Sequence, residues 1–133
     1  MKQYFYPAVF TKEDNNLISV NFPDIPGCFT SGEGLEDAYA MAQDVLCLML
    51  YDMEEEKKKI PAPSDISKLK TERNEFVAII SCDTLEYRKF FDNKAVKKTL
   101  SIPSWLNIEA EREGINFSAI LQDALKQRLN INR

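Results

Sequence analysis

One stretch of the chain has a sustained helical pattern, and the stretches around it have the pattern of strands. From Leu35 to about Glu56, apolar residues recur every three or four positions, which is the spacing of one face of an α-helix. Pro61 and Pro63 end this pattern, because a proline cannot donate the hydrogen bond that a helix interior needs. One long helix among strands predicts a sheet with a single helix packed on it.

The strand-like stretches lie on both sides of this helix. Residues 4–10 are aromatic and β-branched, and residues 17–22 alternate between apolar and polar side chains, which predicts a hairpin. A short third strand is predicted within 28–31, and the continuous apolar run at 75–82 is typical of a well-covered strand. The order β-β-β-α-β therefore predicts an α+β domain over residues 1–83.

Charge divides the chain into two parts. Residues 1–93 carry 10 Lys and Arg against 17 Asp and Glu, a balance of −7, whereas residues 94–133 carry 7 against 4, a balance of +3. This asymmetry predicts two modules with different partners, an acidic body and a mildly basic tail. Residues 84–93 are predicted to be the linker between them.

The tail, residues 94–133, has the pattern of one strand and two helices. Apolar and polar residues alternate up to Pro103, which with Ser104 suits the first turn of a helix, and Gly114 is suited to end that helix. Asn116 is a good N-cap for the second helix. About 40 residues rarely form a core without disulfides, metals or oligomerisation. Two copies that paired their strands would share one core, so we expect a homodimer through the tail.

Alternation in the paired strands would separate an apolar face from a polar one. The apolar face would close the shared core, and the polar side chains of both chains would project from the other face. A two-stranded ribbon fits the major groove of B-DNA, and the start of the second helix would offer N–H groups to a phosphate. The alternative is a dimerisation arm or an edge strand with a wet face. The residues predicted to bind DNA are Lys97, Thr99, Ser101, Asn116 and Ser118.

Cysteine and histidine usage excludes several kinds of site. Cys28, Cys47 and Cys82 are odd in number and widely separated, so we expect neither a disulfide framework nor a zinc site. The chain has no histidine, which removes the commonest general base and the commonest metal ligand. Ser-His and Cys-His nucleophile systems are therefore excluded within this chain.

Two motifs resemble known families. The tail segment KKTLSIPSWL…AEREGINFSAILQDAL resembles the ribbon-helix-helix repressors, most specifically at its Gly-Ile-Asn-x-Ser junction. The segment FPDIPGCFTSGEGLEDAYAMA (Phe22–Ala42) resembles the signature of the HicB antitoxins, in which a strand ends at Asp-x-Pro-Gly-Cys and a glycine-containing turn opens a helix. Gly34 departs from this signature, because the family often has Thr or Ser there as the helix cap. Together the two motifs extend the resemblance over nearly the whole chain.

The resemblance implies a fold, a function and partners. HicB-like proteins have a partial RNase H-like N-terminal domain and a β-α-α ribbon-helix-helix tail. They neutralise a small RNA-cleaving HicA toxin and repress their own operon. We therefore expect a cytoplasmic dimer or higher oligomer that binds a HicA-like toxin and operator DNA but no membrane, since no apolar run approaches the roughly 20 residues that cross a bilayer. The residues expected to bind the toxin are Phe22, Asp24, Ile25 and Phe29.

The residues leave two other functions open. One is a ribbon-helix-helix transcriptional repressor whose N-terminal domain senses a small ligand and has no toxin partner. The other is a metal-dependent ribonuclease, which would need several converging carboxylates. Those in the helix fall outside its apolar stripe, and the first two predicted strands contain no acidic residue. We therefore predict an inhibitor and regulator, not an enzyme, with no cofactor and no metal. The carboxylates weighed for the ribonuclease are Asp24, Glu36, Asp37 and Asp44.

Overall fold

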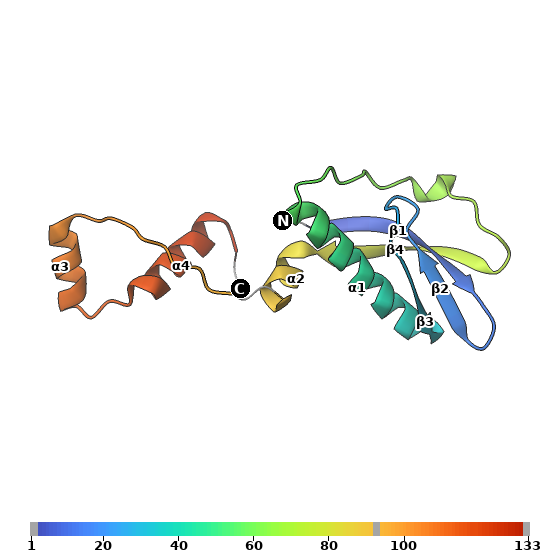
Figure 1. Ribbon diagram of the computed structural model, residues 1–133, viewed down its shortest axis with the longest axis horizontal. Coiled ribbons are helices and arrows are strands. Elements are labelled where there is room, and N and C mark those ends of the chain that lie inside the picture. Colours follow the sequence, from blue (N-terminus) through green and yellow to red (C-terminus); the bar gives the residue numbers. More distant parts are fainter. Residues whose placement is uncertain (1–2, 92–93, 132–133) are drawn as a thin grey trace. The chain divides into compact units, whose positions relative to one another are not determined.

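The computed structural model describes residues 3–91 and 94–131 (Figure 1). The chain divides into two compact units, Met1–Lys94 and Ala95–Arg133. The first unit contains a four-stranded sheet with helices α1 and α2, and the second contains helices α3 and α4. No helix within the described ranges is long and apolar enough to cross a membrane.

The sheet of the first unit is antiparallel, with the strand order β3-β2-β1-β4. Its strands are β1 (Gln3–Lys12), β2 (Leu17–Asn21), β3 (Phe29–Glu33) and β4 (Glu75–Asp83). The turn between β1 and β2 contains Asn15 and Asn16, whose φ angles of 61° and 62° suit a tight hairpin. The predicted hairpin and the order of strands around one long helix are confirmed. Between that helix and β4 the chain makes a 3₁₀ turn, η1 (Ile66–Lys68).

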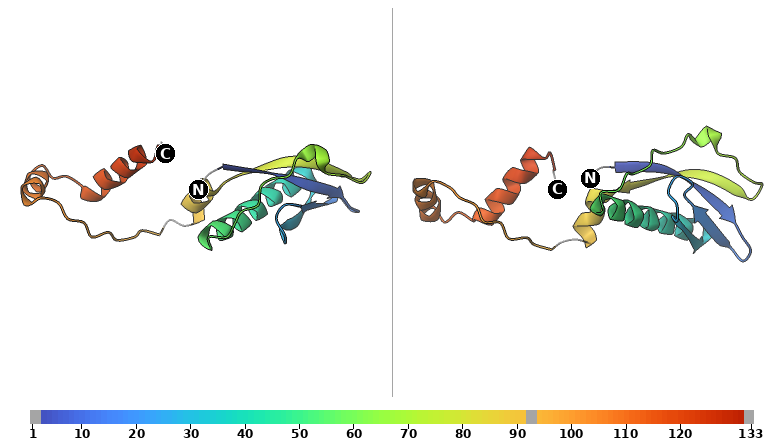
Figure 2. Two further views of the ribbon diagram at one scale, coloured as in Figure 1. Left: turned by 90° about the horizontal axis from the view of Figure 1, so that it is seen from above. Right: turned by 45° about the horizontal axis from the view of Figure 1, so that its top comes forward.

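Helix α1 (Gly34–Glu55) lies across one face of the sheet (Figure 2). It buries Ala38, Ala42, Leu46 and Leu50, whose spacing keeps them on one face of the helix. These positions confirm the predicted apolar stripe, although Leu35 at its start is exposed. The core that α1 closes against the sheet also contains Tyr6, Ala8, Phe10, Ile18, Val20, Phe22, Ile25, Cys28, Ile80 and Cys82.

Two glycines determine how β3 meets α1. A Cβ atom at Gly32 would lie 2.5 Å from the backbone nitrogen of Ala38, so only a glycine allows the strand to approach the helix this closely. Gly34 has a φ of +82°, a left-handed conformation that favours glycine. The sequence places the N-cap of the helix at Gly34, but the N-cap is Glu33. Gly34 instead makes the turn, and its N–H donates to the carbonyl oxygen of Asn16 at 2.8 Å.

Most of the predicted linker is a helix. Residues 84–91 form α2 (Thr84–Phe91), which corrects the prediction of a linker over 84–93 up to residue 91; residues 92 and 93 lie outside the described ranges. The Asp83 carboxylate accepts hydrogen bonds from the N–H groups of Leu85 and Glu86, at 3.0 and 3.2 Å, and caps the helix. Asp83 and Glu86 have the spacing of a capping box, which is the sequence signal that predicts such a start.

The structure joins Cys47 of α1 to Cys82 of β4 in a disulfide, with their Cα atoms 5.5 Å apart. This disulfide corrects the expectation, drawn from the number and spacing of the cysteines, that disulfides do not build the fold. The two cysteines are 35 residues apart in the sequence, and only the packing of the helix on the sheet brings them together. Cys28 is free and buried, and burial raises the pKa of its thiol to about 11. Cys28 is therefore a core residue rather than a reactive thiol.

The second unit is an extended segment followed by two helices, α3 (Ser104–Arg112) and α4 (Phe117–Arg128). The predicted strand over 96–102 is not formed in the single chain, because a strand needs a hydrogen-bonded neighbour. Gly114 ends the first of these helices as predicted, with a φ of +68°. The N–H of Ile115 donates to the carbonyl oxygen of Ala110 at 3.0 Å, which completes a Schellman motif.

Candidate functional site

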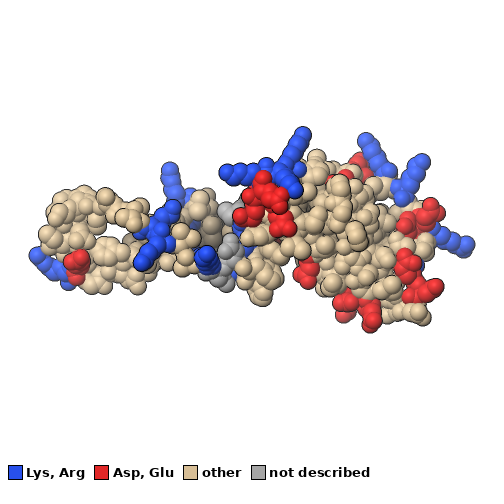
Figure 3. Space-filling model, in the orientation of Figure 1, with Lys and Arg blue, Asp and Glu red and all other residues tan. Residues whose placement is uncertain are grey.

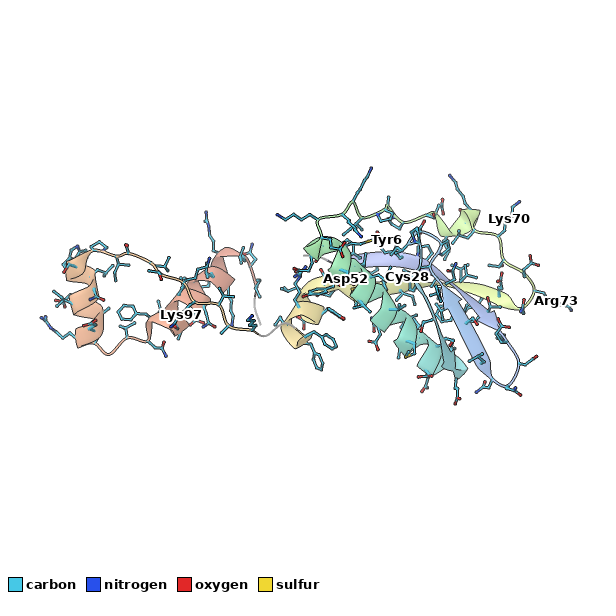
Figure 4. All side chains as sticks on the ribbon, in the orientation of Figure 1. Tyr6, Cys28, Asp52, Lys70, Arg73 and Lys97 are labelled. Carbon is cyan, nitrogen blue, oxygen red and sulfur yellow. A yellow bond between two sulfur atoms is a disulfide. The ribbon has the colours of Figure 1, made fainter. Side chains whose placement is uncertain are left out.

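The extended segment of the second unit has a polar side and an apolar side. Lys97, Thr99 and Ser101, predicted to bind DNA, are exposed, and Figure 4 marks Lys97. Leu100 and Ile102, which alternate with them, line a groove of about 520 Å³ together with residues of α4. Lys98 lines the same groove, so alternate residues of the segment share one side, and one of these residues is charged.

The start of α4 has the predicted cap and an exposed hydroxyl group. The side-chain oxygen of Asn116 accepts a hydrogen bond from the N–H of Ala119 at 3.1 Å. Ser118 is exposed and borders the groove against the extended segment. Because the Asn116 oxygen is engaged by its own helix, an incoming phosphate would meet the other N–H groups of the first turn.

The helices of the second unit bury no side chain among the residues that the structure describes. Large apolar side chains are exposed instead, and exposed apolar patches of this kind are typical of interaction surfaces. Val96 is the most exposed of them, at 76%, and Phe117 is 44% exposed even where α4 faces the groove. The full set is Val96, Leu100, Ile102, Trp105, Leu106, Ile108, Ile115, Phe117, Ile120, Leu125 and Leu129.

The residues predicted to contact a toxin are divided between core and surface. Phe22 and Ile25 are each 1% exposed, so their side chains present no surface to a partner. Asp24 accepts hydrogen bonds from the Ser64 N–H, at 3.0 Å, and from the Ser64 hydroxyl. Phe29 is 67% exposed on β3. Phe22 continues the apolar alternation of Ile18 and Val20, whereas the burial of Ile25 depends on the path of the proline-rich loop, which periodicity does not predict.

A cluster of polar side chains that the sequence analysis missed joins α2 to α1 and β1. The Glu54 carboxylate accepts hydrogen bonds from the hydroxyls of Tyr4 and Thr84, at 2.8 and 3.0 Å. Arg88 donates to Glu54 at 3.0 Å and also pairs with Glu55. The side chains of Glu54 and Arg88 are only 10% and 19% exposed, and charges this far from water need such partners. The cluster therefore holds α2 firmly on the first unit.

The ionisation of this cluster is fixed over a wide range of pH. Burial opposes the charged form of Glu54, but hydrogen bonds from Tyr4, Arg88 and Thr84 outweigh it and hold the pKa of Glu54 below its ordinary value. Burial, followed by the hydrogen bond to Glu54, raises the pKa of Tyr4 to about 12. A neutral tyrosine therefore donates to an ionised carboxylate at neutral pH, which suits a structural role rather than proton transfer.

The carboxylates weighed for a ribonuclease do not converge. Glu36, Asp37 and Asp44 are exposed on α1, as predicted, and Asp24 lies in the loop before β3. Within 3–91 and 94–131, no group of three or more His, Cys, Asp or Glu side chains is placed to hold a metal ion. The geometry of these residues gives no support to two-metal hydrolysis.

Most of the chain matches one protein family. Residues 6–123 match the family described as HicB_like antitoxin of bacterial toxin-antitoxin system. The chain is also similar to antitoxin HicB 2 of Photorhabdus laumondii, with 40% identity over 63 residues. That alignment covers 47% of this chain and 45% of the relative, so the match spans less than half of the curated protein.

Solved structures resemble the fold over both units. A chain of a toxin–antitoxin complex from Streptococcus pneumoniae aligns with a TM-score of 0.62 and 31% identity, covering 95% of this chain and 99% of that one. The antitoxin HicB of Burkholderia pseudomallei shares the fold, with a TM-score of 0.56, 21% identity, and coverage of 95% and 98%. Since the family match extends from the first strand into α4, the chain belongs to the HicB-like antitoxin family.

Proposed function

We propose that the chain neutralises a HicA-like RNA-cleaving toxin with its first unit and binds operator DNA as a dimer with its second. The observation that carries the proposal is the difference in burial between the two units of this chain. The first unit has a closed core, whereas the helices of the second bury no described side chain. A chain with these properties acts by binding: the first unit presents its surface as a folded monomer, and the second unit needs a second copy to bury its apolar side chains.

The first unit has the charge of a domain that binds a basic protein. Residues 1–93 have a net charge of −7, and Figure 3 shows acidic side chains gathered on this unit. A protein that cleaves RNA carries positive charge where it contacts phosphates. Opposite charges would speed the encounter, and the antitoxin would inhibit by covering the RNA-binding surface. The relative from Streptococcus pneumoniae comes from a toxin–antitoxin complex, which supports a toxin as the partner.

The second unit supports a ribbon-helix-helix arrangement. In that arrangement, Val96, Leu100 and Ile102 of two chains would form one buried ribbon face, and the exposed apolar side chains of α3 and α4 would close around it. The side chains predicted to read DNA would then project together from the other face. A first unit with a partial RNase H-like fold and a ribbon-helix-helix second unit are parts of the same proposal.

The roles of the DNA-contacting residues differ. Lys97, Thr99 and Ser101 would bond base edges in the major groove, where a lost base contact costs about 1–3 kcal/mol. Ser118 and the first-turn N–H groups of α4 would contact a phosphate and fix the register. Asn116 would act by capping this helix, which keeps those N–H groups in place.

The experiment is co-expression of the chain with the small protein encoded beside its gene. We expect the two to co-purify and the toxin's cleavage of RNA to be suppressed.

Truncation after residue 93 should abolish binding to the operator while toxin binding persists. Lys97→Ala should weaken operator binding, whereas Lys68→Ala, an exposed lysine of the first unit, should leave it unchanged. Toxin binding by residues 94–133 alone would contradict this division of roles.

A further inference from the structure

Helix α2 is buried at its start and exposed at its end. Thr84 is fully buried, whereas Phe90 and Phe91 are 76% and 65% exposed. The ring of Tyr87 packs between two others: its centroid is 5.3 Å from that of Tyr51 on α1 and 4.6 Å from that of Phe91. The ring centroid of Phe90 is 4.8 Å from that of Phe91. A row of aromatic rings therefore extends from the packed part of the unit into solvent.

This aromatic row borders a groove of about 340 Å³, which we call the α1–α2 groove. Met41 and Leu48 line it and are 39% and 46% exposed. They lie seven residues apart on α1 and form a second apolar row, separate from the row that packs on the sheet. An apolar groove on a unit whose core is already closed indicates a contact surface. The complete lining is Thr30, Met41, Asp44, Val45, Leu48, Tyr87 and Phe91.

The charge around the α1–α2 groove is acidic. Helix α1 contains six acidic residues and no basic one. Asp44 lines the groove, and Asp52, marked in Figure 4, lies on the same helix. After burial, the charges of Asp52 and Asp44 raise the pKa of Tyr87, so both carboxylates act on the aromatic row.

We propose that the toxin docks in the α1–α2 groove, placing an apolar side chain between Leu48 and Phe91 and a lysine or arginine against Asp44. This proposal rests on the proposed function and names the surface that performs it. A second copy fits the groove less well, because two copies of the same face would bring like carboxylates together. The toxin, with a basic RNA-binding surface, supplies the opposite charge.

The test measures the affinity of the full chain for the protein encoded beside its gene. Phe91→Ala should weaken binding by about 30-fold or more, the loss expected when an aromatic side chain leaves the centre of an interface. Leu48→Ala, at a second position of the groove, should weaken it in the same direction. The matched control is Phe5→Ala, since Phe5 is 53% exposed on β1 and lies outside the groove lining. We expect that control to change binding by less than about 3-fold, as at the rim of an interface.

A second pair of variants tests the charge. Asp44→Asn should slow association at low salt, and the difference should shrink as salt screens the charge. The control is Asp14→Asn, an exposed carboxylate in the turn between β1 and β2. Equal salt dependence in the two variants would remove Asp44 from the interface and overturn its part in the proposal.

The outcomes separate the groove from the function. If the unaltered chain does not bind the neighbouring protein, both proposals fail. If it binds but Phe91→Ala and Leu48→Ala retain full affinity, the toxin uses another face and only the groove is overturned. If Phe91→Ala lowers the oligomeric state of the chain alone and leaves toxin affinity unchanged, the groove holds a second copy, which also overturns the proposal. Tyrosine absorbance during unfolding verifies that each variant is folded.

Discussion

The two units of this chain differ in whether they bury the apolar side chains of their helices. Leu46 on α1 is fully buried, whereas Leu125 on α4 is 51% exposed, although both lie on the apolar face of an amphipathic helix. The difference is one of size, because the first unit has a sheet and a long helix to close a core and the second has two short helices. Sequence pattern determines which elements form, and the number of elements determines whether they can be buried without a partner.

The chain carries a separate optical probe in each unit. Trp105, its only tryptophan, lies in the second unit, and all five tyrosines lie in the first. Tyrosine absorbance therefore reports the unfolding of the first unit, and tryptophan fluorescence reports the second. The predictions below use this separation to test whether the first unit is self-sufficient and the second depends on a partner.

The largest effect is expected from Leu46→Ala. Removing a fully buried leucine side chain costs about 2–5 kcal/mol of unfolding free energy, through lost burial and the cavity left behind. The loss should appear in tyrosine absorbance during urea unfolding and should not depend on protein concentration. Leu125→Ala should act differently, lowering the stability reported by Trp105 only at concentrations where the chain is dimeric. A concentration-independent effect of Leu125→Ala would break the comparison.

The next largest effect concerns the ion pairs of the two units. Arg88 is 19% exposed and bonds to Glu54, so Arg88→Gln should cost about 2–3 kcal/mol by leaving a buried carboxylate with fewer partners. Arg112 pairs with Glu109 in the second unit but is 67% exposed. Arg112→Gln should therefore change stability by less than about 0.5 kcal/mol. Chemical denaturation of both variants gives the two free-energy losses. Equal losses would contradict the prediction that the buried ion pair contributes more to stability than the exposed one.

A glycine in each unit allows a third comparison. Gly32→Ala would place a Cβ atom 2.5 Å from the backbone of Ala38, and separating β3 from α1 should cost about 1–3 kcal/mol. Gly114→Ala meets no atom within 4 Å, so its cost should come from the φ of +68° alone, about 1 kcal/mol. Thermal unfolding followed through both probes separates the two. A milder effect at Gly32 than at Gly114 would mean that β3 and α1 can move apart easily.

The sequence predicts the elements of both units better than their surroundings. The period of the apolar residues located α1, the hairpin and both helices of the second unit, because that period records which side of an element is apolar. It could not place Ile25, which a loop carries into the core, or pair Cys47 with Cys82 across two elements. Helix α2 was missed because it has only eight residues, too few to show a clear helical period, although the capping pattern at Asp83 signals its start.

The candidate surfaces follow the same rule. Lys97, Thr99 and Ser101 were predicted because alternation along one segment gives each residue a side. All three are exposed, and so are the apolar residues between them, so their role at DNA stays a prediction. The α1–α2 groove has no such local signal. Its lining comes from β3, α1 and α2, so it exists only after the first unit has folded. A surface built from one element can be predicted from its pattern, whereas a surface built from three requires the structure.

The smallest of the losses predicted for the first unit is expected from Tyr4→Phe, which removes one hydrogen bond to Glu54 and should cost about 1 kcal/mol near pH 8. The cost should depend on pH, because the pKa of Tyr4 is raised to about 12 from an ordinary value of 10.0. Below pH 10 the tyrosine is neutral in both states and its contribution is fully present. As the pH rises toward 12, the unfolded chain loses this proton first and the contribution disappears.

The stabilities of the wild type and Tyr4→Phe should therefore converge between pH 10 and pH 12 in denaturation followed by circular dichroism. Parallel curves would show that the hydroxyl is not bonded as described. The second unit has no tyrosine, so Trp105 fluorescence should give the same curve for both proteins.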